Sequence, residues 1–339
     1  MLERTSDSAW PLPSSRATAL LIVRGYLPVW VVLAAAYSVA FLVFFIRGIA
    51  VSPDTWLTIT VVNLLALALV SAACWFGAPV IVRAVATVAV FIQMTAPLSF
   101  FSYAAVALGR ANPLLDGHLA RIDAAMGIDW LALVAWFNQH PLLIAALERA
   151  YHGTIVPVIF TLVLLALLGR TRAIIRFYLL FIGACLLCTA LSAALPAVGA
   201  YVFFEPADAV RSAISADAGV WHLQHFKALR DGTFALFDVT ATEGLVTFPS
   251  FHTAAALAIP LALRGLGPIS GLAWAVAGVI IVSTVPIGGH YVIDVIAGGA
   301  LALGLDLALR RAMRSAPARQ RFPDLRLIPA WNPNRAGTH

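Results

Sequence analysis

Two short histidine motifs stand in the C-terminal half of the chain, and their side chains could do acid, base or nucleophilic chemistry. The first is P-S-F-H, which ends at His252, and the second is H-Y-V-I-D, which runs from His290 to Asp294. Because His290 and Asp294 are four residues apart, a helix would put both on one face, where the carboxylate can orient the imidazole. An imidazole can transfer protons near neutral pH and can also attack an electrophile. We therefore expect these three side chains to work together.

The elements that must position these histidines are membrane helices. The chain has 339 residues, of which 61% are hydrophobic and 11% charged, whereas soluble domains average about 25% charged residues. Apolar runs near the roughly 20 residues that cross a bilayer predict an all-α, polytopic helical bundle with about eight spans. The predicted spans are residues 27–46, 57–76, 84–108, 142–168, 174–195, 250–267, 270–287 and 290–309. Two crossings separate the motifs, which returns both to the same membrane face.

The distribution of basic residues predicts the orientation of the bundle. With eight spans, the side that holds both termini carries fifteen Lys and Arg, and the other side carries six. The positive-inside bias then makes the termini cytoplasmic, and we expect an integral protein of a bacterial inner membrane with a periplasmic or extracellular site. The net charge of +6 follows from this topology, so we expect no nucleic-acid partner. The three cysteines all fall inside predicted spans, so neither a disulfide framework nor a redox motif is expected.

The two motifs resemble those of the type 2 phosphatidic acid phosphatase superfamily, P-S-x-H and S-R-x-x-x-x-x-H-x-x-x-D. Ser283 is seven residues before His290, where the family serine belongs, but Thr284 stands where the family arginine would be. The family's K-x-x-x-x-x-x-R-P motif is absent, because Lys227 is the only lysine. These departures resemble the branch that includes inositol phosphorylceramide synthases and their bacterial relatives. The resemblance covers roughly residues 140–310 and implies a six-helix catalytic core.

The resemblance also implies a mechanism. His290 would attack phosphorus, Asp294 would orient its ring, and His252 would protonate the leaving alkoxide and later deprotonate the acceptor. The substrate would be a lipid phosphate or phosphodiester in the bilayer. The acceptor would be water in a phosphatase, or an alcohol such as inositol or a hydroxylated lipid in a synthase. No metal and no other cofactor is expected.

Further residues are candidates for binding the substrate. Ser250 and the amides at the helix start can donate to phosphate oxygens, and Gly289 lets the backbone approach closely. Arg230 is either a phosphate clamp or an ordinary solvated loop charge, with Lys227 as a weaker candidate. Glu148 and His152 share a helical face and form either a head-group pocket or an internal ion pair. Ser283 completes the set through the motif, and a metal site at His222 and His225 is not expected because no carboxylate completes one.

The chain divides into five predicted segments. An amphipathic pattern over residues 110–141, with Asp116 and Asp123 among its polar positions, predicts a helix on the membrane surface that acts as a lid or guides head groups. The five segments are a flexible cytoplasmic arm (1–20), N-terminal spans (21–109), the interfacial stretch (110–141), the catalytic core (142–310) and a basic cytoplasmic tail (311–339).

Two other functions compete with the enzyme. Ionisable groups within spans also mark ion pathways, so a transporter or proton-coupled carrier is one alternative. The clustering of these groups at one membrane face disfavours it. A catalytically inactive lipid-binding scaffold is the other alternative, and the presence of both histidines and the aspartate disfavours it.

Overall fold

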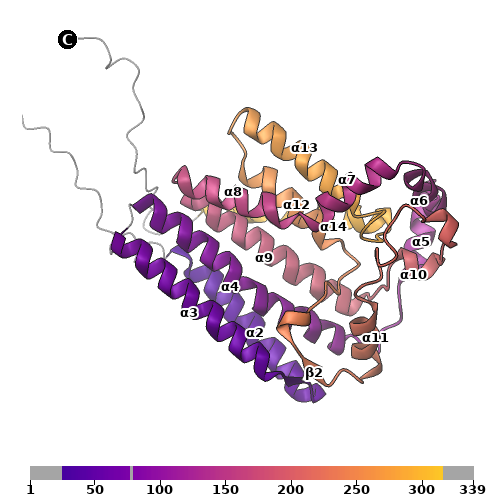
Figure 1. Cartoon of the computed structure of the whole chain (residues 1–339), viewed down its shortest axis with the longest axis horizontal. Coiled ribbons are helices and arrows are strands. Elements are labelled where there is room, and N and C mark those ends of the chain that lie inside the picture. The colour runs from indigo at the N-terminus through magenta and orange to yellow at the C-terminus, as the bar shows by residue number, and fades with distance from the viewer. Residues whose placement is uncertain (1–24, 77–78, 316–339) are drawn as a thin grey trace, which may run out of the picture.

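The computed structural model describes residues 25–76 and 79–315 and shows a bundle of helices (Figure 1). The predicted arm (1–20) and most of the predicted tail (311–339) therefore lie outside the described residues. The longer helices are α2 (Leu27–Arg47), α3 (Pro53–Phe76), α4 (Pro79–Leu108), α9 (Thr171–Ala194) and α14 (Val292–Ser315). Shorter ones are α5 (Asp116–Ala125), α6 (Trp130–Asn138), α7 (Pro141–His152), α8 (Ile155–Leu167), α10 (Ala200–Phe204), α11 (Leu223–Asp231), α12 (Phe251–Ala262) and α13 (Pro268–Ser283). The prediction of an all-α bundle is confirmed.

Among the described residues, five helices are long and apolar enough to cross a membrane, namely α2, α3, α4, α9 and α14, or six segments if the bent pair α6–α7 is one span. Large apolar side chains on α3, such as Trp56, Leu64 and Trp75, are exposed, as expected of a surface that faces lipid. The chain is thus an integral membrane protein. The other predicted spans contain the apolar helices α8, α12 and α13, which have 13, 12 and 16 residues. At about 1.5 Å per residue these are shorter than a hydrocarbon core of about 30 Å.

The predicted fourth span (142–168) is not one continuous helix. Helix α7 ends at Gly153, where a Cβ atom would come within 2.5 Å of the Arg149 carbonyl oxygen. The Thr154 hydroxyl donates to the carbonyls of Ala150 and Tyr151, which removes the helical acceptors at this point. The chain then restarts as α8. The break puts the Tyr151 ring into the interior, where it stacks on the His252 ring.

The stretch predicted to lie on the membrane surface forms two helices, α5 and α6, that pack onto the end of the bundle (Figure 1). Gly127 has φ 79° and separates them, and the Asp129 side chain caps α6 by accepting from the Ala132 amide. Asp116 and Asp123 are buried, at 3% and 1% exposure. These two carboxylates, which are polar positions of the predicted surface helix, each bind backbone amides of another segment.

The centre of the bundle is α12, whose residues from Thr253 to Ala262 are all buried. It packs against α9, α13 and α14. Alanines at five of its positions allow this close packing. Gly298 of α14 lies against the Ser250 backbone, where a Cβ would come within 2.2 Å of the Ser250 carbonyl oxygen. The start of α12 is thus held tightly against the start of α14.

The long segment between α9 and α12 covers one end of the bundle. It contains α10, α11, the short 3-10 helices Asp208–Val210 and Val239–Ala241, and strand β2 (Leu236–Phe237). Strand β2 pairs in parallel with β1 (Ala50–Val51), with Ala50 opposite Leu236. The pairing fastens this segment to the turn between α2 and α3.

Candidate active site

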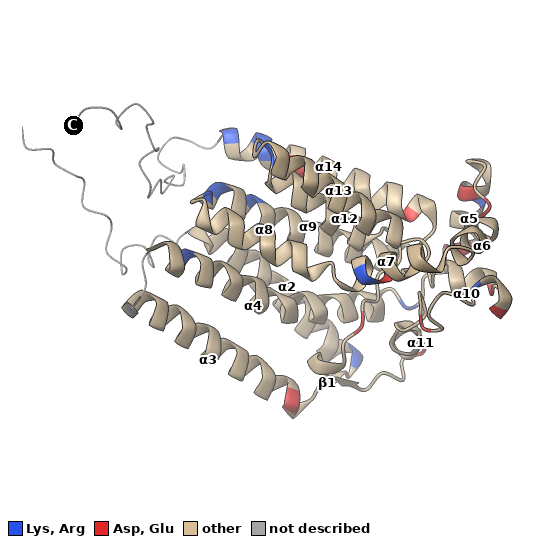
Figure 2. Ribbon diagram, turned by 45° about the horizontal axis from the view of Figure 1, so that its top comes forward, with Lys and Arg blue, Asp and Glu red and all other residues tan. Residues whose placement is uncertain are grey.

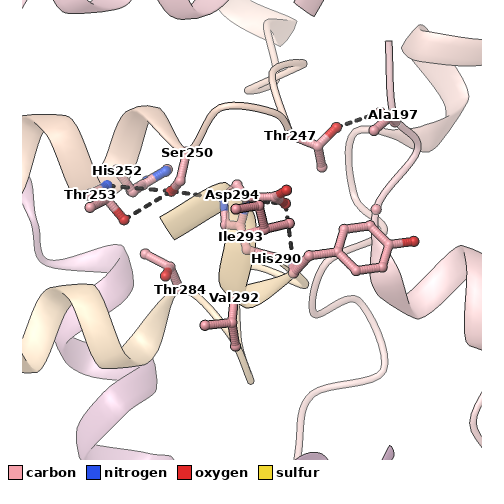
Figure 3. Close-up of polar contacts among 12 residues, drawn as sticks. Ala197, Thr247, Ser250, His252, Thr253, Thr284, His290, Val292, Ile293 and Asp294 are labelled. Carbon is pink, nitrogen blue, oxygen red and sulfur yellow. Dashed lines mark hydrogen bonds and ion pairs between the residues drawn. The ribbon is translucent and has the colours of Figure 1, made fainter. Parts of the chain in front are cut away.

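Three side chains from the two motifs form a hydrogen-bonded chain (Figure 3). The Nδ1 atom of His290 lies 3.2 Å from Asp294 Oδ2, and its Nε2 atom lies 3.3 Å from Ser250 Oγ. All three residues are buried, at 2% exposure or less. With the carboxylate accepting a hydrogen bond from Nδ1–H, the Nε2 lone pair is directed to the side of Ser250.

The backbone carbonyl and the backbone amide of His290 each form a hydrogen bond. The Trp130 indole N–H donates to the His290 carbonyl at 3.0 Å, and the His290 amide donates to the Thr284 carbonyl at 3.2 Å. Asp294 also accepts from the Tyr291 amide at 3.0 Å, so it caps the first turn of α14 in the manner of a capping box. The imidazole is thus held by the same residue that stabilises the helix start.

Two aspartates of α5 support this region, and the sequence prediction did not include them in the site. Asp123 accepts the amides of Val292 and Ile293, at 2.8 and 2.9 Å, which are free donors of the first turn of α14. Asp116 accepts from the Val198 and Gly199 amides and from the Tyr291 hydroxyl. The sequence pattern could not identify them as part of the site, because the backbone amides that they bind belong to segments far away in the sequence.

Ser250 is the N-cap of α12, and this fixes its hydroxyl. Its Oγ accepts from the Thr253 amide at 3.4 Å and from the Thr253 hydroxyl at 3.2 Å, while its own amide donates to the Asp294 carbonyl at 3.0 Å. With its acceptor positions used, the hydroxyl can donate to His290 Nε2 or to a bound oxygen. Its neighbour His252 stacks on the Tyr151 ring, with centroids 4.3 Å apart.

One cavity of about 860 Å³ reaches His290, His252 and Tyr151, whereas Ser250 and Asp294 do not line it. Its polar end includes His290, His252, His152 and Thr247, and its apolar wall comes from α4, α8 and α9 through residues such as Met94, Val158 and Phe181. The side chains that line it within the described part of the chain include no lysine and no arginine. Within the same residues, no group of three or more His, Cys, Asp or Glu is arranged to hold a metal ion.

A third buried histidine, His222, lines the same cavity and was not predicted to be part of the site. It is 3% exposed, and its Nε2 atom is buried without a hydrogen-bond partner among the described residues. Burial lowers its pKa from 6.5 to about 4, and proximity to His290 acts in the same direction. Burial also lowers the pKa of His290, which lies in the turn before α14, to about 4. Both rings are therefore neutral at pH 7.

Comparison with known proteins identifies the family. The model of the PAP2 superfamily matches residues 117–307, which is more than half of the chain. The chain belongs to the PAP2 superfamily. No curated protein and no solved structure matched. The predicted superfamily is thus confirmed, and the PAP2 match begins inside α5, so it includes Asp123 as well as both histidine motifs.

Several residues predicted to bind substrate in this PAP2 protein lie elsewhere. Arg230 of α11 donates to the Asn112 carbonyl at 2.8 Å, and its guanidinium lies 5.6 Å from the Phe226 ring centre. Neither Arg230 nor the exposed Lys227 lines the cavity. Ser283 is buried and its hydroxyl donates to the Ile280 carbonyl at 2.6 Å, so it stabilises the end of α13.

The remaining predicted residues are split between the cavity and its surroundings. His152 lines the cavity beside Trp221, with ring centres 5.4 Å apart, whereas Glu148 does not line it, and no ion pair joins the two within the described residues. Gly289 has φ 70°, and a Cβ there would come within 2.9 Å of the Tyr201 ring and 3.0 Å of Gly219 Cα. This glycine permits the close backbone contact that carries the turn to His290.

Proposed function

We propose that this protein is an integral membrane phosphoryl-transfer enzyme that acts on a lipid phosphodiester through a phosphohistidine on His290. The observation that carries the proposal is the His290 ring held between Asp294 and Ser250 in a cavity with an apolar wall. A buried neutral imidazole whose second nitrogen is oriented by a carboxylate is a suitable nucleophile. The apolar wall suits the hydrocarbon part of a lipid.

In the first half of the proposed reaction, His290 Nε2 attacks phosphorus, and the bond from phosphorus to the leaving lipid alkoxide breaks. His252 enters this step as the imidazolium ion, gives one proton to that alkoxide and becomes neutral. Asp294 stabilises the positive charge on the phosphorylated ring. The Ser250 hydroxyl and the first amides of α12 donate to the phosphoryl oxygens, since a helix start presents free N–H groups.

In the second half, His252 takes a proton from the acceptor hydroxyl, whose oxygen attacks phosphorus. The bond between phosphorus and His290 Nε2 then breaks, which returns the ring to its neutral form. The same histidine serves as acid and then as base, as microscopic reversibility requires. The protons balance without a cofactor.

The charge of the cavity favours a phosphodiester over a phosphomonoester. A phosphodiester carries one negative charge and a phosphomonoester carries about two at pH 7. Because no lysine or arginine lines the cavity in the described part of the chain, whereas Asp217 and Glu243 do, a second negative charge would lack a counter-charge in a buried site. We therefore propose transfer of a head-group phosphate to an alcohol, as in inositolphosphotransferase-like enzymes, at the non-cytoplasmic face.

The test uses protein purified in detergent with a chelator present and a lipid phosphodiester labelled at phosphorus. Wild-type protein should transfer the label to an added alcohol, and a trapped label should be acid-labile, as a phosphohistidine is. His290→Ala should lose at least several orders of magnitude in rate, while His118→Ala, an exposed histidine on α5, should match wild type. Absence of any turnover in wild type with all lipids tried would favour the carrier function instead.

A further inference from the structure

A second cavity lies at the end of the bundle away from His290. It has a volume of about 740 Å³ and lies where α8 ends, α9 begins, α12 turns into α13, and α14 ends. Six arginines line it, namely Arg170, Arg172, Arg176, Arg264, Arg310 and Arg314. Figure 2 shows these basic positions gathered at the ends of α8, α9 and α14. We refer to this cavity as the arginine basin.

One carboxylate forms ion pairs with three of these arginines. Asp306 of α14 is 1% exposed and lies 3.1 Å from Arg264, 3.8 Å from Arg176 and within hydrogen-bond distance of Arg310. No other acidic residue occurs in residues 155–182, 251–290 or 295–315, the segments that supply the lining of the basin. Within these ranges, one aspartate thus stands against the six arginines that line the basin.

The positive-inside bias explains which membrane face these arginines occupy, but not why they surround one cavity. They come from α9, from the turns before α9 and after α12, and from α14, and the fold brings them together. Arg310 Nε is buried and has no hydrogen-bond partner among the described residues, although buried donors are normally satisfied. Like-charged groups gathered without enough counter-charge are destabilising unless an anion binds between them.

We propose that the arginine basin binds a phosphate-bearing anion, either the head group of an anionic lipid or a soluble phosphate compound. Guanidinium groups bind phosphate oxygens through paired N–H donors, which makes arginine the preferred residue for such recognition. The basin lies at the ends of membrane helices, so head groups and soluble anions can both reach it. Arg310 lies 18 residues along α14 from Val292, or about 27 Å at 1.5 Å per residue, and the basin shares no lining residue with the cavity at His290.

The test measures anion binding in nanodiscs, with two arms that distinguish the sources. In one arm, nanodiscs of phosphatidylcholine are titrated with inorganic pyrophosphate. In the other, the fraction of phosphatidylglycerol in the nanodisc is increased. Stabilisation of the protein against thermal unfolding reports binding in both arms. The variant is Arg170→Gln/Arg314→Gln, because both side chains are exposed and neither forms an ion pair within the described residues.

The matched control is Arg110→Gln/Arg121→Gln, which removes two exposed arginines nearer the catalytic end. Neither variant changes a residue that lines the cavity at His290, so an anion that binds there affects both variants equally. The basin variant should weaken the apparent affinity by about tenfold or more, as expected when charged hydrogen bonds are lost, and the control should stay within about twofold of wild type. Weakening in the lipid arm identifies a head group, and weakening in the pyrophosphate arm alone identifies a soluble anion. Equal binding by the basin variant and wild type in both arms would overturn the proposal.

Discussion

At the scale of single residues, the site depends on which nitrogen of His290 carries the proton. Asp294 lies at Nδ1 and Ser250 at Nε2. A carboxylate that accepts from Nδ1 leaves the other nitrogen free to attack. Asp294 also accepts the Tyr291 amide, so a test of its charge must preserve its shape.

Asp294→Asn provides that test. The amide oxygen can still cap α14, but the negative charge behind the ring is lost. By analogy with the aspartate behind a triad histidine, turnover should fall by about a thousandfold or more with little change in KM. The measurement is the rate of label transfer from a lipid phosphodiester, with Asp231→Asn, an exposed acid on α11, as the control. A fall below tenfold would mean that Asp294 has only a structural role.

His222 lines the catalytic cavity with an unpartnered Nε2 atom, so we expect it to hydrogen-bond to the bound substrate. His222→Phe should lower kcat/KM by about tenfold to a hundredfold, since a hydrogen bond to a charged group is worth about 1.5–3 kcal/mol. His225→Phe is the matched control on the same helix, because His225 is bonded to the Tyr103 hydroxyl at 2.6 Å and does not line the cavity. Equal effects of the two variants would contradict a substrate contact by His222.

From the burial of His222 we predict that the stability of the protein depends on pH. Burial lowers the pKa of His222 from 6.5 to about 4, so between these values the unfolded chain binds a proton that the folded chain does not. The free energy of unfolding is therefore highest above about pH 6.5 and falls as the pH drops to about 4. This shift corresponds to about 3 kcal/mol, from about 1.4 kcal/mol per pKa unit. Unfolding curves at pH 7 and pH 4.5 should differ less for His222→Gln than for wild type, and an unchanged difference would show that His222 is not buried as a neutral ring.

At the scale of elements, the start of α14 is the most constrained part of the fold. Asp123 holds its first two amides from α5, Asp294 holds the amide of Tyr291, and Gly298 brings it against α12. Helix α5 therefore acts as a support for the catalytic turn, although it lies far from His290 in the sequence.

Substitutions of two helix-capping aspartates, Asp123 and Asp129, distinguish a loss of fold stability from a loss of His290 positioning. Asp123→Ala and Asp129→Ala each remove a side-chain cap, which typically costs about 0.5–2 kcal/mol, so both should lower the melting temperature. Only Asp123 holds the turn that carries His290, so only Asp123→Ala should also reduce kcat, by an amount larger than its loss of folded protein explains. Normal kcat in folded Asp123→Ala protein would rule out this positioning role.

At the scale of the whole molecule, the sequence predicted what depends on local spacing and composition. The helical bundle, the membrane location and the superfamily follow from apolar runs and from the motifs around His252 and His290. The break between α7 and α8 is a local feature of Gly153 and Thr154, whose hydroxyl donates to the Ala150 and Tyr151 carbonyls, and the apolar pattern does not mark it. The burial of Asp123 and the position of His222 depend on contacts between distant segments, which no periodicity records.

The arrangement of charges predicts how the molecule is oriented in the membrane, and this orientation can be tested. The arginine basin and the catalytic cavity lie at opposite ends of α14, so a bundle that spans the membrane exposes them on opposite faces. The positive-inside bias then puts the basin in the cytoplasm and His290 outside. In intact cells, an impermeant maleimide should label Asp231→Cys, an exposed position on α11, and not Ala312→Cys, an exposed position near the end of α14. Wild type is the blank, since Cys74 and Cys185 are half-buried and Cys188 is buried. Labelling of Ala312→Cys alone would reverse the orientation, and the substrate would then have to be sought in the cytoplasmic leaflet.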